Sequence, residues 1–213
     1  MQNAPCQMPH LHCAFCIKPH SGDAAFTVLE LLFAVTLSVT LGAMAAPQLL
    51  AAADDLRAAG AVRYVATKLQ QGRMEAVSRS AAVGWQFVST TDGYTYAPYL
   101  DGNGNGVRSQ EIQRAIDQRI GPIEQLMDRF AGVDFGVIPG LPPVDPGGTP
   151  PGADPIRLGS SSILTFTALG TSSSGTLYVR GRRNAQYAIR ILGETGKTRV
   201  LKFDPRRRQW KPA

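Results

Sequence analysis

Cysteine and histidine are absent from the sequence after residue 20, although the chain has 213 residues. The remainder therefore has no disulfide, no histidine to act as an acid or base, and none of the usual zinc ligands. It also lacks a Gly-x-Ser-x-Gly elbow, a phosphate loop and a dinucleotide fingerprint. These absences predict a protein that is not an enzyme and needs no cofactor. Catalysis by Ser, Asp or Glu alone is the alternative that they leave open.

The first 20 residues hold all the Cys and His side chains, three of each. Thiolate and imidazole are the preferred ligands of tetrahedral zinc, and Cys13 and Cys16 have the spacing of a zinc-ligand pair. One interpretation is a metal-binding extension. The other is an incidental extension or a misplaced start, with Met8 as the alternative start. The six side chains are Cys6, His10, His12, Cys13, Cys16 and His20.

A long apolar run, Phe26 to Ala46, has 21 residues and a single charge, Glu30. A helix of that length spans about 30 Å, the thickness of the hydrocarbon core of a bilayer. A carboxylate there costs about 2.5 to 3.5 kcal/mol at the bilayer centre and less near its edge, so Glu30 indicates a function. An ordinary signal anchor and a secretory signal peptide cut at Ala43-Met44-Ala45 are the alternatives. Neither explains Glu30, and the apolar core of a signal peptide would be shorter, at roughly 7 to 15 residues.

The order Ala25, then Phe26-Thr27-Val28-Leu29-Glu30, then an apolar helix resembles the processing site of type IV prepilins and pseudopilins. The resemblance implies that prepilin peptidase cuts between Ala25 and Phe26 and that the new amino terminus of Phe26 is methylated. Ala25 stands where the family usually has Gly. Glu30 would be the fifth residue of the mature chain, and Pro47 lies where pilins often loosen the helix.

The carboxylate of Glu30 is then expected to pair with the positively charged amino terminus of Phe26 in a neighbouring subunit, because such a pair offsets the cost of burying either charge alone. The resemblance implies four partners: prepilin peptidase, sibling pilins or pseudopilins, the inner-membrane assembly platform and the lipid bilayer. It also implies a single-pass protein of the bacterial inner membrane, with a cytoplasmic N-terminus, a periplasmic C-terminal domain and incorporation into a pilus or pseudopilus.

The pattern predicts an α+β fold in which a long N-terminal helix packs on a small antiparallel sheet. We expect a leader at 1–25, a transmembrane helix at 26–47, an amphipathic helix at 48–83 and a sheet domain at 84–213. The domain would include a flexible loop at 139–160, since 139–155 has seven Pro and four Gly, and a basic tail at 204–213. The predicted inward face of the amphipathic helix is Leu49, Ala53, Leu56, Ala59, Val62, Ala66, Leu69, Ala76 and Val77.

Extended segments are predicted after residue 84. Asp92-Gly93 favours a turn, so 85–88 and 94–97 are predicted to form a hairpin. Four further strands, at 163–169, 176–179, 187–192 and 199–203, predict an antiparallel meander. Residues 110–130 are expected to hold short helices interrupted at Gly121-Pro122. Their predicted inward residues are Ile112, Ile116, Ile120, Ile123 and Leu126.

Several stretches also resemble the minor pseudopilins of the GspH/FimT group: 70–83, Trp85, 101–106 with 111–112, 164–170 and 196–200. The resemblance covers most of the chain after the apolar run, except the Pro-rich loop and the residues after Phe203. It implies a minor pilin or pseudopilin, a structural subunit of a type II secretion pseudopilus or a type IV pilus that takes part in fibre assembly or initiation. The alternative is a FimT-like minor pilin that binds extracellular DNA for uptake.

Positive charge is concentrated at the C-terminus, where residues 178–213 hold eleven Lys or Arg and two acids, a net charge of +9. A basic set with an aromatic ring can hold phosphates and stack a base, so DNA is a candidate partner. Gly-Lys-Thr-Arg at 196–199 resembles the Gly-Arg-x-Arg element of FimT-like pilins. The alternatives are that the basic side chains protect strand edges from aggregation, or that they bind lipid headgroups or an acidic neighbouring subunit. The candidate residues are Arg182, Arg183, Lys197, Arg199, Arg206, Arg207, Arg208, Trp210 and Lys211.

Alternating Gly and polar residues at 101–106 offer oxygen ligands in the order of a calcium loop. The bidentate acid of such a loop belongs at position 12, whereas Glu111 stands at position 11. Gly and Asn also form ordinary surface loops, because both tolerate left-handed backbone conformations. The sequence therefore favours no metal site, with calcium as a weak candidate on Asp101, Asn103, Asn105 and Glu111.

Overall fold

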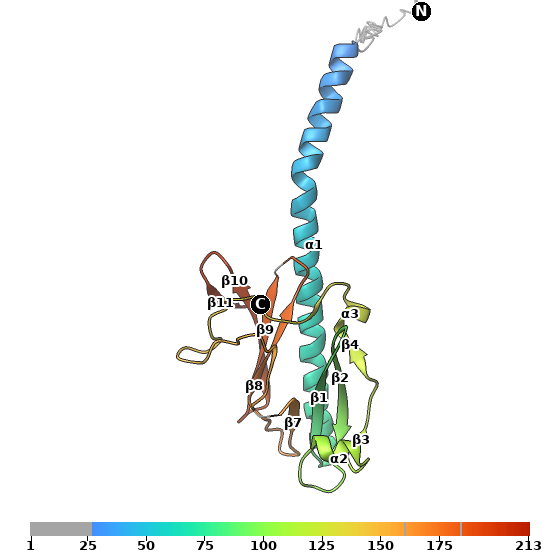
Figure 1. Cartoon of the computed structure of the whole chain (residues 1–213), viewed down its shortest axis with the longest axis vertical. Coiled ribbons are helices and arrows are strands. Elements are labelled where there is room, and N and C mark those ends of the chain that lie inside the picture. The colour runs from blue at the N-terminus through green and yellow to red at the C-terminus, as the bar shows by residue number, and fades with distance from the viewer. Residues whose placement is uncertain (1–26, 160, 184) are drawn as a thin grey trace, which may run out of the picture. The chain divides into compact units, whose positions relative to one another are not determined.

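Figure 1 shows the computed structural model of the chain, which describes residues 27–159, 161–183 and 185–213. The structure combines one long helix with two antiparallel sheets, so the predicted α+β class is confirmed. Residues 1–26 lie outside the described residues. The predictions for the Cys and His side chains of the first 20 residues, and for Ala25 and Phe26, therefore concern residues about which the structure says nothing.

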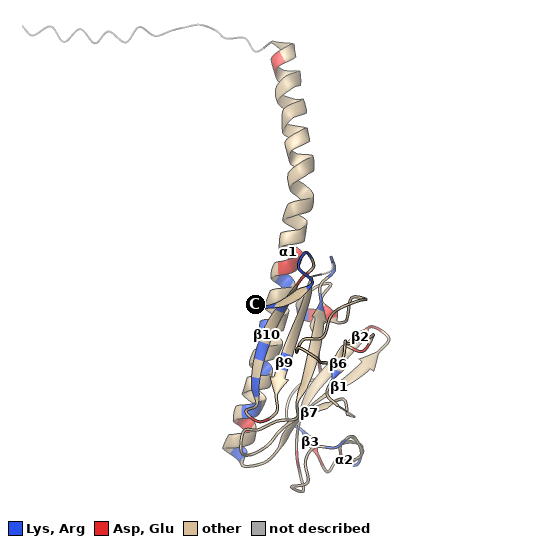
Figure 2. Cartoon of the chain, turned by 90° about the vertical axis from the view of Figure 1, so that its left-hand side faces the viewer, with Lys and Arg blue, Asp and Glu red and all other residues tan. Residues whose placement is uncertain are grey.

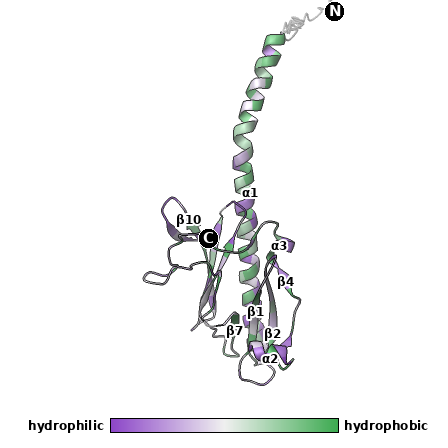
Figure 3. Ribbon diagram, in the orientation of Figure 1, coloured by the Kyte–Doolittle hydropathy of each residue, from purple (hydrophilic) through white to green (hydrophobic). Residues whose placement is uncertain are grey.

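The long helix, α1 (Val28–Arg79), has 52 residues and continues through Pro47. Its first part belongs to a compact unit that ends at Met44, and the remainder of the chain forms a second unit. Large apolar side chains of the first unit are exposed, including Leu29 at 78% and Phe33 at 70%. Figure 3 shows hydrophobic residues along this part of the helix. By length and composition, α1 could cross a membrane.

In the second unit, the face of α1 that packs on the sheets is made mainly of small residues. The predicted inward face is correct at Val62 and Leu69 but wrong at Leu49 and Leu56, which are 70% and 73% exposed. The helix also ends before the predicted position 83, since Val83 is part of a strand. The buried residues of α1 are Asp54, Ala58, Ala61, Val62, Val65, Leu69, Gly72 and Ala76.

Small side chains on this face let the sheets approach the helix closely. A Cβ added at Gly72 would lie 2.3 Å from Nε1 of Trp85, which is buried. A Cβ at Gly60 would lie 3.3 Å from the ring of Phe130. One core cluster accordingly contains side chains from α1 and from both sheets.

The first sheet has the order β3-β2-β1-β7, and β4 also pairs with β2. The predicted hairpin is confirmed, because β1 and β2 pair from Val83↔Leu100 to Thr90↔Gly93. The bounds are β1 (Val83–Thr90), β2 (Gly93–Leu100), β3 (Gln118–Arg119), β4 (Glu124–Gln125) and β7 (Ile163–Phe166).

The second sheet has the order β11-β10-β9-β8-β5, and β6 also pairs with β8. The bounds are β5 (Asp134–Phe135), β6 (Ile156–Arg157), β8 (Gly175–Arg180), β9 (Gln186–Leu192), β10 (Lys197–Asp204) and β11 (Gln209–Pro212). The predicted four-strand meander is wrong in its first member, because β7 pairs with β1. The residues predicted as a basic tail include β11, which extends the sheet beyond β10.

Residues 110–130 contain two short helices, α2 (Ser109–Gln113) and α3 (Leu126–Arg129), separated by β3 and β4. Leu126 is buried, as predicted. The prediction is wrong for Ile116 and Ile123, which are exposed. Two-residue strands lie along β2 where helix was expected. β3 pairs with Tyr99 and Leu100, and β4 pairs with Thr95 and Tyr96.

The Pro-rich segment at 139–155 has no helix or strand, but it contributes to a core. Leu141 is buried on the face of the second sheet that points away from α1, in a cluster with Tyr178 and Phe203. The carbonyl of Pro142 accepts a hydrogen bond from Trp210 Nε1. The first part of the predicted loop thus has apolar and hydrogen-bonded contacts with the second sheet, while its flexibility stays a prediction.

Candidate functional site

The start of α1 is fixed by Thr27, whose hydroxyl accepts the backbone N–H of Glu30 at 3.2 Å. A Thr at the cap with a Glu three positions later is the capping-box pattern, which satisfies N–H groups that have no partner inside the helix. This role of Thr27 was not predicted from the sequence. The spacing Thr-x-x-Glu before an apolar run was the signal that would have found it.

Glu30 lies exposed in the first turn of α1. Hydroxyl groups further along the apolar segment are satisfied within the helix: Ser38 donates to the carbonyl of Ala34 at 2.7 Å, and Thr40 to that of Leu37 at 2.8 Å. The carboxylate of Glu30, in contrast, has no hydrogen bond or ion pair with any residue that the structure describes. A charge in an apolar segment without such a partner is suited to a contact with another molecule.

Pro47 lies inside α1 and is compatible with the helix there. Proline has no N–H, so the carbonyl of Ala43, four residues earlier, lacks its usual helical partner. This weak point lies close to the boundary between the two units, which falls between Met44 and Ala45. The predicted place for helix loosening therefore coincides with the end of the first unit.

Two aspartates of α1 hold the second sheet at one end. Asp54 is 4% exposed, and its two oxygens accept the backbone N–H groups of Arg182 at 3.0 Å and Arg183 at 2.7 Å. Asp55 accepts hydrogen bonds from the Tyr187 hydroxyl at 3.0 Å and from Lys202 Nζ at 2.6 Å. The turn between β8 and β9 is thereby fixed to residues 54 and 55 of the helix.

The structure divides seven of the nine candidate DNA-binding residues between the two ends of the second sheet. The turn after β8 and the turn after β10 lie at the same end, because Arg180 pairs with Gln186 and Asp204 with Gln209. The turn between β9 and β10, beside Lys197, lies at the opposite end. At about 3.3 Å per residue, β10 separates the two ends by roughly 23 Å. The first end carries Arg182, Arg183, Arg206, Arg207 and Arg208, and the second carries Lys197 and Arg199.

Trp210 and Lys211 are engaged within the domain. The Trp210 ring lies 5.3 Å from that of Phe203 and 5.9 Å from that of Tyr178, measured between centroids. Lys211 Nζ forms an ion pair with Asp204. Trp210 therefore packs on the sheet, and the geometry does not present it as a free platform for a base.

The four weak calcium candidates lie together in the loop after β2. Asp101 Oδ1 accepts the backbone N–H groups of Asn103 and Gly104, and its Oδ2 accepts that of Gly106 at 2.6 Å. The side-chain amides of Asn103 and Asn105 donate to Glu111 Oε1. Among the described residues, no group of three or more Asp, Glu, His or Cys could hold a metal. The loop is thus closed by its own hydrogen bonds.

Burial of the Asp101 carboxylate acts to raise its pKa, but the backbone N–H groups of Gly106, Asn103 and Gly104 hold the pKa below its usual range. A carboxyl group with a lowered folded-state pKa stabilises the fold above the pKa of the unfolded chain. That stabilisation is lost as the pH falls through the folded-state pKa. The loop is therefore expected to loosen at acidic pH, below the usual range for aspartate.

Replacing Asp101 with Asn is expected to destabilise the domain by about 1–3 kcal/mol, because one acceptor oxygen becomes an amide nitrogen facing an N–H donor. Urea unfolding of the detergent-solubilised chain at pH 7 measures the change, and the difference should shrink towards pH 3. Gln110→Ala, at an exposed position just beyond the loop, is the control. Calcium should leave the unfolding midpoint of the unchanged chain where it is. A clear rise with calcium would show that these side chains act as metal ligands.

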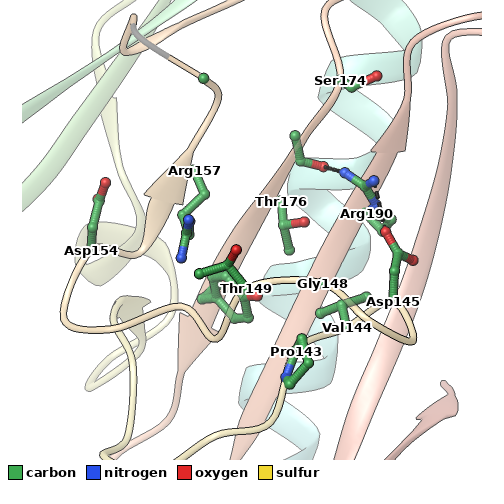
Figure 4. A pocket seen from close by; sticks show the side chains of 13 residues that line it. Pro143, Val144, Asp145, Gly148, Thr149, Asp154, Arg157, Ser174, Thr176 and Arg190 are labelled. Atoms are coloured by element: carbon green, nitrogen blue, oxygen red, sulfur yellow. Dashed lines mark hydrogen bonds and ion pairs between the residues drawn. The ribbon is translucent and has the colours of Figure 1, made fainter.

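A pocket of about 540 Å³ lies on the outer face of the second sheet, between the Pro-rich loop and strands β8 and β9. Figure 4 shows Arg157 and Thr149 on one side of it and Arg190 on the other, paired with Asp145 at 2.7 Å. Arg190 also donates to the carbonyl of Gly175 at 3.0 Å. These contacts tie the loop to the sheet, and the balanced charges give the pocket no preference for an anion.

On the first sheet, Glu124 connects β4 to α1 in a cluster that the sequence reasoning missed. Its carboxylate forms an ion pair with Lys68 at 2.8 Å and accepts a hydrogen bond from the Tyr64 hydroxyl. Burial acts to raise the pKa of Glu124, but the hydrogen bonds from Lys68 and Tyr64 hold it below its usual range. Nothing in the sequence pattern marks Glu124 as the partner of Lys68, 56 residues away.

Comparison with known proteins places the chain in a family. The family described as Type II transport protein GspH matches residues 61–196, which is more than half of the chain. The match begins in the buried face of α1 and ends at the turn before β10. No curated protein and no solved structure matches the chain.

Proposed function

Because the chain belongs to the GspH family of type II transport proteins, we propose that it is a minor pseudopilin, a structural subunit that assembles with sibling subunits through its N-terminal helix. Prepilin peptidase would cut between Ala25 and Phe26 and methylate Phe26. The mature chain would sit in the inner membrane by its apolar segment, with the second unit in the periplasm, and would enter a type II secretion pseudopilus or a type IV pilus at the assembly platform.

The observation that carries this proposal is the carboxylate of Glu30. It is exposed on an apolar helix and has no partner among the described residues. Burying it in a bilayer or in a bundle of helices is unfavourable unless an opposite charge lies beside it. The amino terminus of Phe26 in a neighbouring subunit would supply that charge and would set the register between the two helices.

A second observation supports assembly through α1. In the second unit, the outer face of the helix exposes large apolar side chains, among them Leu49, Leu56 and Met74. Small residues fill the opposite face, which packs on the sheets. Exposed apolar patches mark sites of association with other proteins or membranes. The helix thus presents both an apolar face and a charged terminus to neighbouring subunits.

Processing gives the direct test of this function. The mature protein isolated from membranes is expected to begin with N-methylated Phe26, as measured by mass spectrometry of the intact chain and of its N-terminal peptide. Ala25→Gly, which restores the residue usual in the family, should give the same terminus with equal or faster processing. An intact Met1 terminus, or a start near Ala46, would contradict the proposal.

DNA uptake is the less supported alternative. The candidate basic residues do not form one patch, and Trp210 is packed against Phe203. A DNA contact would therefore be divided between two ends of the second sheet. The arginines at the end of the second sheet beside Asp54 lie close to the part of α1 that follows the apolar run. This position points to a different ligand.

A further inference from the structure

We propose that the arginines in the turns after β8 and β10 form a surface that binds the anionic headgroups of the membrane in which the chain is anchored. The surface consists of Arg182, Arg183, Arg206, Arg207 and Arg208, and we refer to it as the turn-arginine surface. This inference rests on the proposed membrane anchoring by α1, and it adds a role for the folded domain in contacting the lipid.

The two turns are held beside one short stretch of the helix. The backbone of Arg182 and Arg183 donates to Asp54, and Lys202, near the end of β10, donates to Asp55. The register of β8, β9, β10 and β11 places both turns at this same end. Figure 2 shows basic residues in the turns near the label of α1.

That stretch of helix follows the apolar run closely. Asp54 and Asp55 are the first charged residues after Glu30. Asp54 comes seven residues after Pro47, which is about 10 Å along a continuous helix. The headgroup regions occupy the outer part of a bilayer that is about 40–45 Å thick in all, with a hydrocarbon core of about 30 Å. With the hydrocarbon core ending near Pro47, as the proposed anchoring requires, the stretch of α1 beside the turn-arginine surface lies within about a Debye length of the headgroups, roughly 8 Å at physiological salt.

The charges of the surface are available for a ligand. All five arginines are exposed, and none forms a salt bridge with a described residue. Arg208 makes one hydrogen bond, from Nη2 to the carbonyl of Gly140. The nearby acids are already engaged: Asp54 accepts two backbone N–H groups, Asp55 pairs with Lys202, and Asp204 pairs with Lys211. The surface thus keeps its positive charge.

A lipid surface fits this arrangement better than a single-stranded nucleic acid does. Phosphates of headgroups lie in a plane and need charge without a groove or stacking ring, whereas single-stranded nucleic acid is usually held by aromatic stacking as well. No aromatic side chain that the structure describes is exposed beside the five arginines. Lys197 and Arg199, at the far end of β10, lie too far from the same plane to contribute, which makes them a matched control.

Hydrogen–deuterium exchange of the full chain in nanodiscs tests the proposal. Peptides covering 204–208 and 181–183 are expected to exchange at least about threefold more slowly in phosphatidylglycerol-containing discs than in neutral phosphatidylcholine discs. The difference should disappear when NaCl is raised from about 50 to about 500 mM, since salt screens exposed charges. A variant with all five arginines changed to Gln should lose it, while Lys197→Gln with Arg199→Gln should retain it.

Equal exchange in both kinds of disc would overturn the inference, even when the chain co-purifies with the disc and is therefore anchored. Protection by added duplex DNA in neutral discs, without protection by anionic lipid, would also overturn it and would assign the arginines to nucleic acid. A chain that fails to enter discs at all would contradict the membrane anchoring itself, and with it this surface. The five-arginine variant is checked for folding by the unchanged exchange of β1 and β9.

Discussion

Replacing Glu30 with Ala is expected to abolish incorporation of the protein into its fibre or initiating complex while leaving membrane insertion intact or improved. Removing a carboxylate from an apolar segment favours insertion by up to about 2.5 to 3.5 kcal/mol. Removing one member of a buried ion pair leaves the other charge uncompensated, which costs about 3–5 kcal/mol, or more than about 100-fold in an association constant. Co-purification with sibling subunits, and carbonate extraction of membranes, measure the two effects separately.

The capping role of Thr27 provides the control for this experiment. If the start of the helix mattered only through its cap, Thr27→Ala would produce the same defect, since the Thr27 hydroxyl accepts the Glu30 N–H. Loss of a cap costs only about 1 kcal/mol, so Thr27→Ala should assemble nearly normally. Glu30→Gln, which keeps the shape without the charge, should behave as Glu30→Ala does. Normal incorporation of Glu30→Ala would show that the proposed pairing with Phe26 does not occur.

Replacing Asp54 with Ala is expected to destabilise the second unit by about 2–4 kcal/mol. The two hydrogen bonds that Asp54 accepts from Arg182 and Arg183 are charge-assisted, and such bonds contribute about 1.5–3 kcal/mol each. In the variant, water can hydrogen-bond to the freed N–H groups of this exposed turn. The expected loss of stability is therefore smaller than the sum of the two hydrogen bonds. Urea unfolding of the full chain in detergent, followed by Trp fluorescence, measures the loss.

Asp55 is the matched control, because it is adjacent in sequence but its side chain is 38% exposed. Its ion pair with Lys202 is largely solvated, and such pairs contribute between about 0 and 1 kcal/mol. The hydrogen bond that it accepts from the Tyr187 hydroxyl adds about 0.5–1.5 kcal/mol. Asp55→Ala should therefore cost less than Asp54→Ala. Equal losses for the two variants would mean that burial of Asp54 is not what makes its contact strong.

The sequence pattern correctly predicted the elements whose formation depends on neighbouring residues. Asp92-Gly93 correctly located the β1–β2 hairpin, and β8, β9 and β10 lie close to their predicted ranges. The partner of β7 could not be found this way. Its pairing with β1 joins Phe166 to Val83 across the whole of residues 84–165, and nothing in the apolar alternation of either segment specifies such a distant partner.

The phase of the helix was mispredicted for a related reason. Counting large apolar residues selects Leu49 and Leu56, yet the sheets pack on Ala58 and Ala61 because these allow a closer approach. In an ordinary amphipathic helix the largest apolar residues face the core. A helix that also contacts other subunits has two apolar faces, and the sequence alone does not say which face belongs to which partner.

The same contrast between local and distant information applies to the candidate site residues. The prepilin-like pattern selects Glu30 from five consecutive residues, and its role stays a prediction, while the basic C-terminal set was grouped by proximity in sequence. The β10–β11 pairing places Trp210 opposite Phe203 and inside a small core. Antiparallel strands also send neighbouring turns to opposite ends of a sheet, so residues 197–199 and 206–208 are close in sequence but separated in space.

The contacts that cover one face of α1 come from strands that lie much later in the chain. Asp54 is joined to Arg182 across 128 residues, and Asp55 to Lys202 across 147. Such long separations slow folding, because a large loop must close before its contacts form. During synthesis α1 is made first, and its alanine face stays uncovered by the second sheet until β8, β9 and β10 have been made. A chain whose synthesis stops early therefore keeps an open helix face, and incompletely folded chains with exposed apolar surface are substrates of chaperones and proteases.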